Sequence, residues 1–217
     1  MALGAVLALP AAGQAEWRPA FGFHVGAITG GAKDLVGSRL SFGGAFELDY
    51  QLSKGTSLVF DVGYRWYPGD FVNVSFIPTP LPIRAAAGTY YESTRVRKTD
   101  GQGMHLTALY RKAIAEGDWY WQAGLRVARN KTTETTTGTR LTITVATAGT
   151  AGSATAVGTI LTQLNTTKTS FGPVVGAGFR FMDRYSLELN LSTLQMESPA
   201  SGSKSGVGAD ISFGIRF

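Results

Sequence analysis

The sequence has 217 residues, a formal net charge of +5, 44% hydrophobic residues and no cysteine. This length fits one domain, and the lack of cysteine excludes disulfides and thiolate metal sites. The chain has only two histidines, His24 and His105, and its scattered acidic residues lack the spacing of metal ligands, so we expect no metal and no cofactor. The positive charge suits nucleic acid or anionic lipid head groups. We favour lipid and expect no nucleic-acid partner, because no nucleic-acid-binding motif is present.

The first residues, 1–15, predict a secretory signal peptide that is cleaved after Ala15. An apolar core is followed by Pro10 and small residues, and a charged, aromatic sequence begins at Glu16. The segment contains no lysine or arginine, which indicates a start upstream of Met1. The alternative is a short buried helix. We therefore expect one mature domain over residues 16–217.

The mature region has no run of 18 apolar residues, so it offers no candidate for a transmembrane helix. A transmembrane β-barrel remains compatible, because its apolar residues alternate with polar ones and its mean hydropathy stays near zero. The mean hydropathy of this chain is +0.04.

Alternation of apolar with small or polar residues predicts eight strands along the chain. Successive side chains of a strand leave opposite faces, so a period of two identifies a strand. The connections alternate in length: long loops follow the odd-numbered strands, and short turns such as Ser53–Gly55 follow the even-numbered ones. The predicted strands cover about residues 20–28, 42–52, 57–67, 104–113, 119–129, 170–181, 185–194 and 207–217.

The last predicted strand carries the most specific pattern. One face presents Ile211, Phe213, Ile215 and Phe217, and the other presents polar residues and glycines. The segment resembles the C-terminal signature of bacterial outer-membrane β-barrels, which typically end in phenylalanine. The resemblance implies that these four residues form the signal read by the barrel-assembly machinery.

The whole mature region resembles the small outer-membrane barrels of the OmpA-barrel and OmpX type. The even strand number, the alternating connections and the large aromatic residues near strand ends carry this resemblance. It implies an all-β fold, a transmembrane up-and-down antiparallel β-barrel of eight strands, in the outer membrane of a Gram-negative bacterium. Both termini are then periplasmic, lipid and lipopolysaccharide surround the barrel, and we expect a monomer. A soluble eight-stranded barrel is the alternative, but its charged face would point outward.

Residues 141–161 leave the strand number open. Their β-branched residues predict a further hairpin, which either extends the fifth and sixth strands above the membrane or inserts to make ten strands. We favour eight, because the hairpin lacks aromatic anchors and has almost no lumen charge. The extended hairpin would present a sheet edge to a partner.

The predicted lumen face carries five acids and five arginines. An eight-stranded barrel is just wide enough for side chains to fill it, and buried charges are stable only when paired. We therefore expect a salt-bridged plug; the alternative is a narrow small-solute pore. The acids are Glu47, Asp49, Asp61, Glu188 and Asp210, and the arginines are Arg65, Arg111, Arg126, Arg180 and Arg216.

A basic group lies in the second long loop, at Arg84, Arg95, Arg97 and Lys98. Arginine and lysine pair well with phosphate, so we expect contact with lipopolysaccharide or another acidic surface polymer. The alternative is a set of solvated charges.

A catalytic function has weak support in the sequence. Some barrels that resemble this chain modify lipid A with a histidine, a serine and an acid. His105 is the one position that we consider, near the outer rim of the fourth predicted strand, and no serine motif lies beside it. We therefore expect no catalytic residues and a non-enzymatic role in surface interaction or envelope integrity.

Overall fold

The computed structural model describes residues 17–37, 39–69, 71–76, 88–114, 118–145, 153–199 and 201–217. For residues 71–76, 88–95, 139–145 and 153–161 it describes the backbone alone. The predicted signal peptide lies outside the described residues. No helix of the described ranges is long and apolar enough to cross a membrane.

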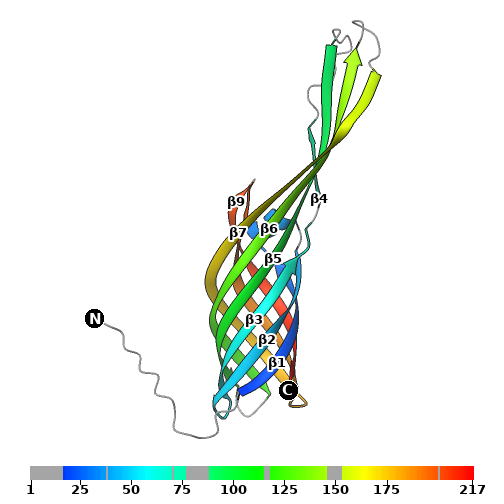
Figure 1. Cartoon of the computed structure of the whole chain (residues 1–217). Helices are drawn as coiled ribbons and strands as arrows, with labels where there is room; N and C mark the ends of the chain where they lie inside the picture. The colour runs from blue at the N-terminus through cyan, green and yellow to red at the C-terminus, as the bar shows by residue number, and fades with distance from the viewer. Residues whose placement is uncertain are drawn as a thin grey trace, which may run out of the picture.

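Eight antiparallel strands form a closed ring, which confirms the predicted barrel and shows that the ten-strand alternative is wrong (Figure 1). Each strand pairs with its neighbours in the ring, and the β3–β5 and β1–β9 pairings complete it. The ring consists of β1 (Trp17–Ile28), β2 (Leu40–Ser53), β3 (Thr56–Tyr67), β5 (Gly88–Ala113), β6 (Trp119–Val145), β7 (Ser153–Phe181), β8 (Tyr185–Ser198) and β9 (Gly202–Arg216).

The short turns define one end of the barrel, called here the turn end. Residues 54–55 join β2 to β3, and residues 182–184 join β7 to β8. β1 begins and β9 ends at this same end (Figure 1). At the opposite end, called here the sheet end, residues 29–39 join β1 to β2, but only residues 199–201 separate β8 from β9, so the long connection predicted after the seventh strand is wrong.

The outer wall of the barrel is apolar, and its interior is polar. In β1 and β3 exposed and buried residues alternate, as the pleat requires. Four apolar residues on three strands, Phe23, Met104, Leu106 and Ile211, are 55–63% exposed. A continuous exposed apolar wall is unfavourable in water and suits the hydrocarbon of a bilayer.

Aromatic rings cluster on the wall near the turn end. Trp17 lies 4.7 Å from Tyr50, and Trp119 lies 5.0 Å from Phe179, measured between ring centroids. Amphipathic rings at such a level form the interfacial girdle of a membrane barrel.

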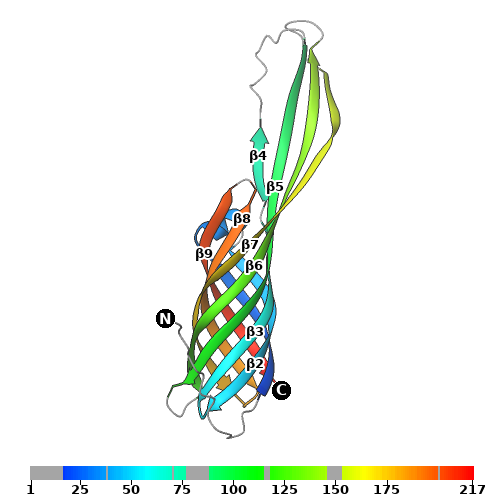
Figure 2. The same cartoon turned by 60° about the vertical axis from the view of Figure 1, so that its left-hand side comes forward.

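Three strands continue far beyond the ring at the sheet end (Figures 1 and 2). β5, β6 and β7 have 26, 27 and 29 residues and stay paired to Gly88↔Val145 and Thr144↔Ser153. β4 (Phe71–Phe76) adds to β5 outside the ring. We call the parts of β4–β7 beyond the ring the projecting sheet. The predicted extension of two strands by a hairpin is confirmed.

The long loop predicted after the third strand is also wrong. Residues 68–103 contain β4 and the first half of β5 instead of a loop. The error has a physical cause: this part of β5 lies outside the apolar wall, so it carries no alternation of apolar residues. The predicted proline-rich loop segment, residues 76–82, falls almost wholly outside the described residues.

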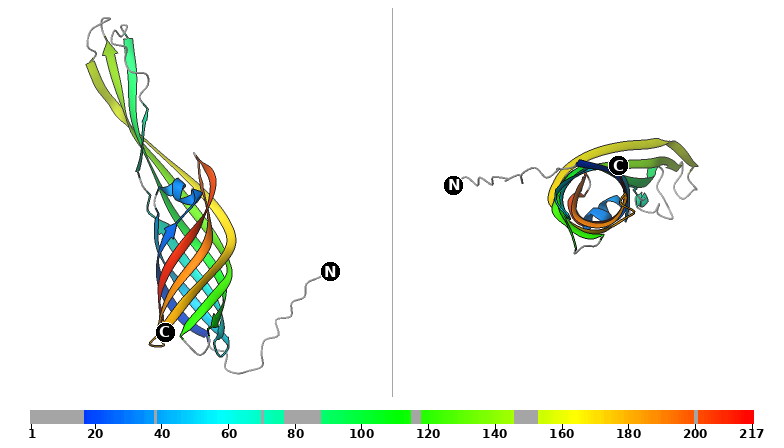
Figure 3. Two further views of the ribbon diagram at one scale, coloured as in Figure 1. Left: turned by 180° about the vertical axis from the view of Figure 1, so that it is seen from behind. Right: turned by 90° about the horizontal axis from the view of Figure 1, so that it is seen from below.

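A short helix, α1 (Gly31–Val36), lies across the mouth at the sheet end (Figure 3). The sequence predicted a loop here. The helix is six residues long, and Gly37 ends it in the left-handed conformation at φ 74°. Its inner face joins an apolar cluster, called here the cap, made of Ile28, Ala32, Leu35, Val36, Tyr67, Leu194 and Met196.

The cap fits closely against β9. A Cβ added at Gly206 would overlap the carbonyl oxygen of Thr29 and approach the Cβ of Ala32 to 3.0 Å. Thr29 is also hydrogen-bonded to β9. Both its N–H and its hydroxyl donate to the carbonyl of Val207, at 2.9 and 3.1 Å. The cap is therefore held against β9 by both apolar packing and backbone hydrogen bonds.

Candidate functional site in the barrel interior

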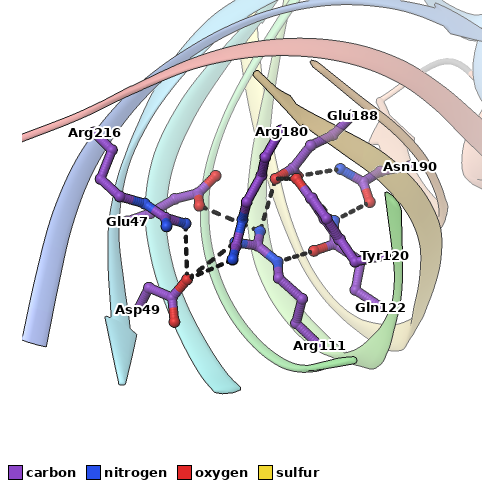
Figure 4. Close-up of polar contacts among 9 residues, drawn as sticks. All are labelled: Glu47, Asp49, Arg111, Tyr120, Gln122, Arg180, Glu188, Asn190 and Arg216. Carbon is purple, nitrogen blue, oxygen red and sulfur yellow. Dashed lines mark hydrogen bonds and ion pairs between the residues drawn. The ribbon is translucent and has the colours of Figure 1, made fainter. Parts of the chain in front are cut away.

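Arg111 is the centre of a buried ion-pair network in the half of the barrel nearest the turn end (Figure 4). Its Nη2 lies 2.7 Å from Oε1 of Glu188 and 3.5 Å from Oε2 of Glu47. Its Nη1 lies 3.4 Å from Oδ2 of Asp49, and its Nε donates to Oε1 of Gln122 at 2.9 Å. The Arg111 side chain is only 3% exposed, so the three carboxylates compensate a charge that has lost most of its contact with water.

Asp49 also forms ion pairs with arginines from two other strands. Nη2 of Arg180 and Nη2 of Arg216 lie 3.0 and 2.9 Å from Oδ2 of Asp49. This is the same oxygen that faces Arg111. The Tyr120 ring supports two of these cations, with Arg111 at 4.6 Å and Arg180 at 5.1 Å from its centroid.

Neutral side chains complete the network around Glu188. The Tyr120 hydroxyl donates to Oε1 of Glu188 at 2.6 Å, and Nε2 of Gln122 donates to Oε2 at 2.8 Å. Asn190 donates to the same Oε2 at 3.3 Å. The predicted lumen network contains charged residues only and so omits Tyr120, Gln122 and Asn190. The alternation of their strands nevertheless places each of them on the inward face.

A second ion-pair group lies nearer the sheet end. Nη2 of Arg65 donates to Oδ2 of Asp210 at 2.6 Å, with side chains 5% and 2% exposed. Arg126 lies 3.9 Å from the same oxygen and donates to the hydroxyls of Thr107 and Ser192, both at 3.0 Å. These contacts join residues from five strands across the lumen.

The two histidines lie inside the barrel. Nε2 of His105 is 3.2 Å from Oδ1 of Asp61, and the rings of His24 and His105 are 5.9 Å apart. Both imidazoles are buried, so His105 does not lie at the outer rim. The described ranges contain no group of three or more histidine, aspartate or glutamate side chains arranged to hold a metal ion.

The free space in the interior is uneven. A cavity of about 690 Å³ opens at the turn end and reaches Arg111. Farther inside, beside Arg65 and His105, the structure shows cavities of about 20 and 10 Å³. A single water needs about 10–15 Å³, so each of these inner cavities has room for about one water molecule.

The basic group predicted for the second long loop is described only in part. Arg84 lies outside them, and only the backbone of Arg95 is described. Arg97 and Lys98 are consecutive in β5 and so face opposite sides of the sheet. Arg97 lies 3.9 Å from Glu134, and Lys98 lies 3.1 Å from Asp100.

The residues predicted as an assembly signal lie on the outer face of β9. Ile211, Phe213 and Phe217 are exposed, and Ile215 is half-buried. The Phe213 ring lies 5.8 Å from the Tyr185 ring on the neighbouring strand. β9 pairs with both β1 and β8, so this strand closes the ring.

Comparison with known proteins gives a structural likeness only. No family model matches the chain. No curated protein matches its sequence. The crystal structure of Ail, the attachment invasion locus protein of Yersinia pestis, matches with a TM-score of 0.50 and 13% identity, over 94% of this chain and 99% of that chain. Neisserial surface protein A matches with a TM-score of 0.47 and 12% identity, over 92% of this chain and 95% of that chain. The likeness to Ail shows that this chain has the fold of the small outer-membrane barrels.

Proposed function

We propose that this chain is a non-enzymatic barrel of the bacterial outer membrane, with a plugged lumen, that binds a partner through its projecting sheet. One observation carries the proposal: β5, β6 and β7 continue as a paired sheet beyond a ring whose interior holds buried ion pairs. The structurally similar Ail is named an attachment invasion locus protein, which agrees with a role in attachment. The apolar outer wall supports the membrane location.

The orientation follows from the two ends of the barrel. Membrane barrels of this type have short turns on the periplasmic side and longer connections outside. The turn end, where β1 begins and β9 ends, is therefore periplasmic in this proposal. The projecting sheet then extends into the surroundings of the cell.

The projecting sheet has a long free edge along β7. β7 forms backbone pairs with β8 only from Val174 to Phe181, and Lys168 still lies 3.8 Å from Glu197 of β8. Among the described strands, residues 153–167 therefore adjoin β6 alone. A free edge presents unpaired backbone N–H and C=O groups, to which an extended segment of a partner can add as a further strand.

The direction of the edge groups can be read from the ladder. The N–H of Arg180 donates to the carbonyl of Asp118, toward β6. Groups of alternate residues in an antiparallel ladder point the same way, and the β6–β7 register is unbroken between Trp119 and Arg140. Odd-numbered residues such as Thr167 therefore direct their N–H groups to the free edge. Pro173 fits this pattern, because a strand tolerates proline where the N–H would face away from its neighbour.

Thr167→Pro is expected to reduce adhesion to a layer of extracellular matrix about tenfold, measured with bacteria that display the chain. The substitution removes one edge N–H and blocks strand addition, while it leaves the β6 ladder intact. Thr167→Val is the matched control, since it keeps the N–H and changes only the exposed side chain. Equal loss in both variants, or in neither, would contradict binding through the edge.

The charges of the projecting sheet support a second, weaker contact with an acidic polymer such as lipopolysaccharide. Changing Arg95, Arg97 and Lys98 together to alanine is expected to lower binding to immobilised lipopolysaccharide by up to about fivefold, because exposed pairs contribute little each. Arg184→Ala, at an exposed position of the turn end that does not line the cavity there, should leave this binding unchanged. Unaltered binding by the triple variant would exclude the contact.

A further inference from the structure

The cavity at the turn end has a surplus of positive charge. It occupies about 690 Å³, within the range of small-molecule sites, and strands around the ring line it. Three acidic and six cationic residues line it. The acids are Asp49, Asp118 and Asp183, and the cations are Arg18, Lys54, Arg111, Lys112, Arg180 and Arg216.

Arg180 and Arg216 have hydrogen-bonding capacity to spare. A guanidinium carries five N–H donors, yet each of these two makes a single side-chain hydrogen bond to the described residues, from Nη2 to Asp49. Nε of Arg180 is buried without a hydrogen-bond partner among them. Arg111 differs, because Glu188, Glu47 and Gln122 also accept from it.

The two arginines are also close to each other. Their Nη2 atoms lie 3.0 and 2.9 Å from one oxygen of Asp49, so these two nitrogens are at most about 6 Å apart. One carboxylate thus faces two cations at the wall of the cavity, in addition to Arg111. An anion with several oxygens would reduce the repulsion between them and use their free donors.

We propose that the cavity at the turn end binds a soluble phosphate-bearing anion, held by Arg180 and Arg216. Phosphate suits the pair, because guanidinium groups bind its oxygens through planar, two-pronged hydrogen bonds. Asp49 holds both guanidinium groups at the cavity wall before the ligand arrives. The volume leaves room for an organic group attached to the phosphate. This site lies at the opposite end from the projecting sheet and does not depend on the surface partner.

The test is calorimetric titration of pyrophosphate into the folded full chain in a non-ionic detergent. We expect saturable binding by the wild type. Arg180→Gln and Arg216→Gln should each weaken it by at least about tenfold, through loss of a charge-assisted hydrogen bond. Arg129→Gln is the matched control, because Arg129 is exposed on β6 and does not line the cavity.

Folding of every variant is checked by the difference in gel mobility before and after boiling. Arg180→Lys and Arg216→Lys keep the charge beside Asp49, and each should bind more weakly than the wild type because lysine lacks the planar fork. The proposal is overturned if the wild type shows no saturable binding, if the glutamine variants bind as the wild type does, or if Arg129→Gln loses binding equally. Binding confined to phosphatidate micelles, without pyrophosphate binding, would also overturn it.

Discussion

Arg111→Ala is expected to destabilise the barrel by about 3–5 kcal/mol, the usual cost of removing one partner from a buried charge network. Arg111 faces Glu188, Glu47 and Asp49, and the variant leaves these carboxylates with reduced compensation in the interior. Gln122 and Tyr120 still donate to Glu188, but neither carries a charge. The measurement is guanidinium unfolding in lipid vesicles, followed by tryptophan fluorescence.

Lys112→Ala is the control, because Lys112 is the exposed neighbour of Arg111 on the same strand and should change stability by less than about 1 kcal/mol. A loss as small for Arg111→Ala would contradict a network that depends on this arginine.

Planar-bilayer recordings distinguish a plug from a pore. We expect no wild-type conductance and none for Arg111→Ala, since the Arg65–Asp210 pair and the cap remain. Steady wild-type channels that widen in the variant would favour the pore.

Asp210→Asn is the second substitution with a large expected effect, also about 3–5 kcal/mol. Asp210 accepts a hydrogen bond from Arg65 at 2.6 Å and lies 3.9 Å from Arg126, so its negative charge compensates both of these guanidinium groups. The asparagine variant keeps the shape of the side chain and removes its charge. The same unfolding experiment measures the loss.

The double variant Arg65→Gln with Asp210→Asn should recover most of that stability. It replaces the buried ion pair by two neutral amides that can still form a hydrogen bond, so no uncompensated Arg65 charge remains. The coupling energy of this cycle separates the pair from general packing. If the double variant is as unstable as the sum of the two single variants, Arg65 and Asp210 do not act as a pair.

Most of the barrel could be predicted from the sequence, because an apolar outer wall around a polar interior imposes a pattern on every ring strand. Each ring strand must present apolar residues outward and small or polar residues inward, as β1 does from Phe21 to Ala27, and this period of two is readable without a structure. The polar interior follows from the same alternation. The first half of β5 carries no such pattern, because it lies beyond the ring and neither of its faces belongs to the apolar wall. The sequence therefore predicts a loop there.

The arrangement within the interior could not be read in this way. Alternation shows that Asp49 faces inward, but not that arginines of three other strands meet on one of its oxygens. That contact depends on the stagger of the strands around the ring, which a single sequence does not encode locally. The cap was missed for another reason: glycines flank a helix of only six residues, and such a segment reads as a loop.

The seam between β1 and β9 also governs how quickly such a barrel can form. Ala20 pairs with Arg216 and Ile28 pairs with Gly208, so this seam joins the two ends of the described chain. Hairpins such as β2–β3 close over a few residues and can form early, whereas the seam requires closure over nearly the whole chain, which is slow. Until the seam closes, β1 lacks its second neighbour and the charged interior stays open to water. Closure at β9 is therefore the step at which the ion pairs become buried and the barrel becomes kinetically stable.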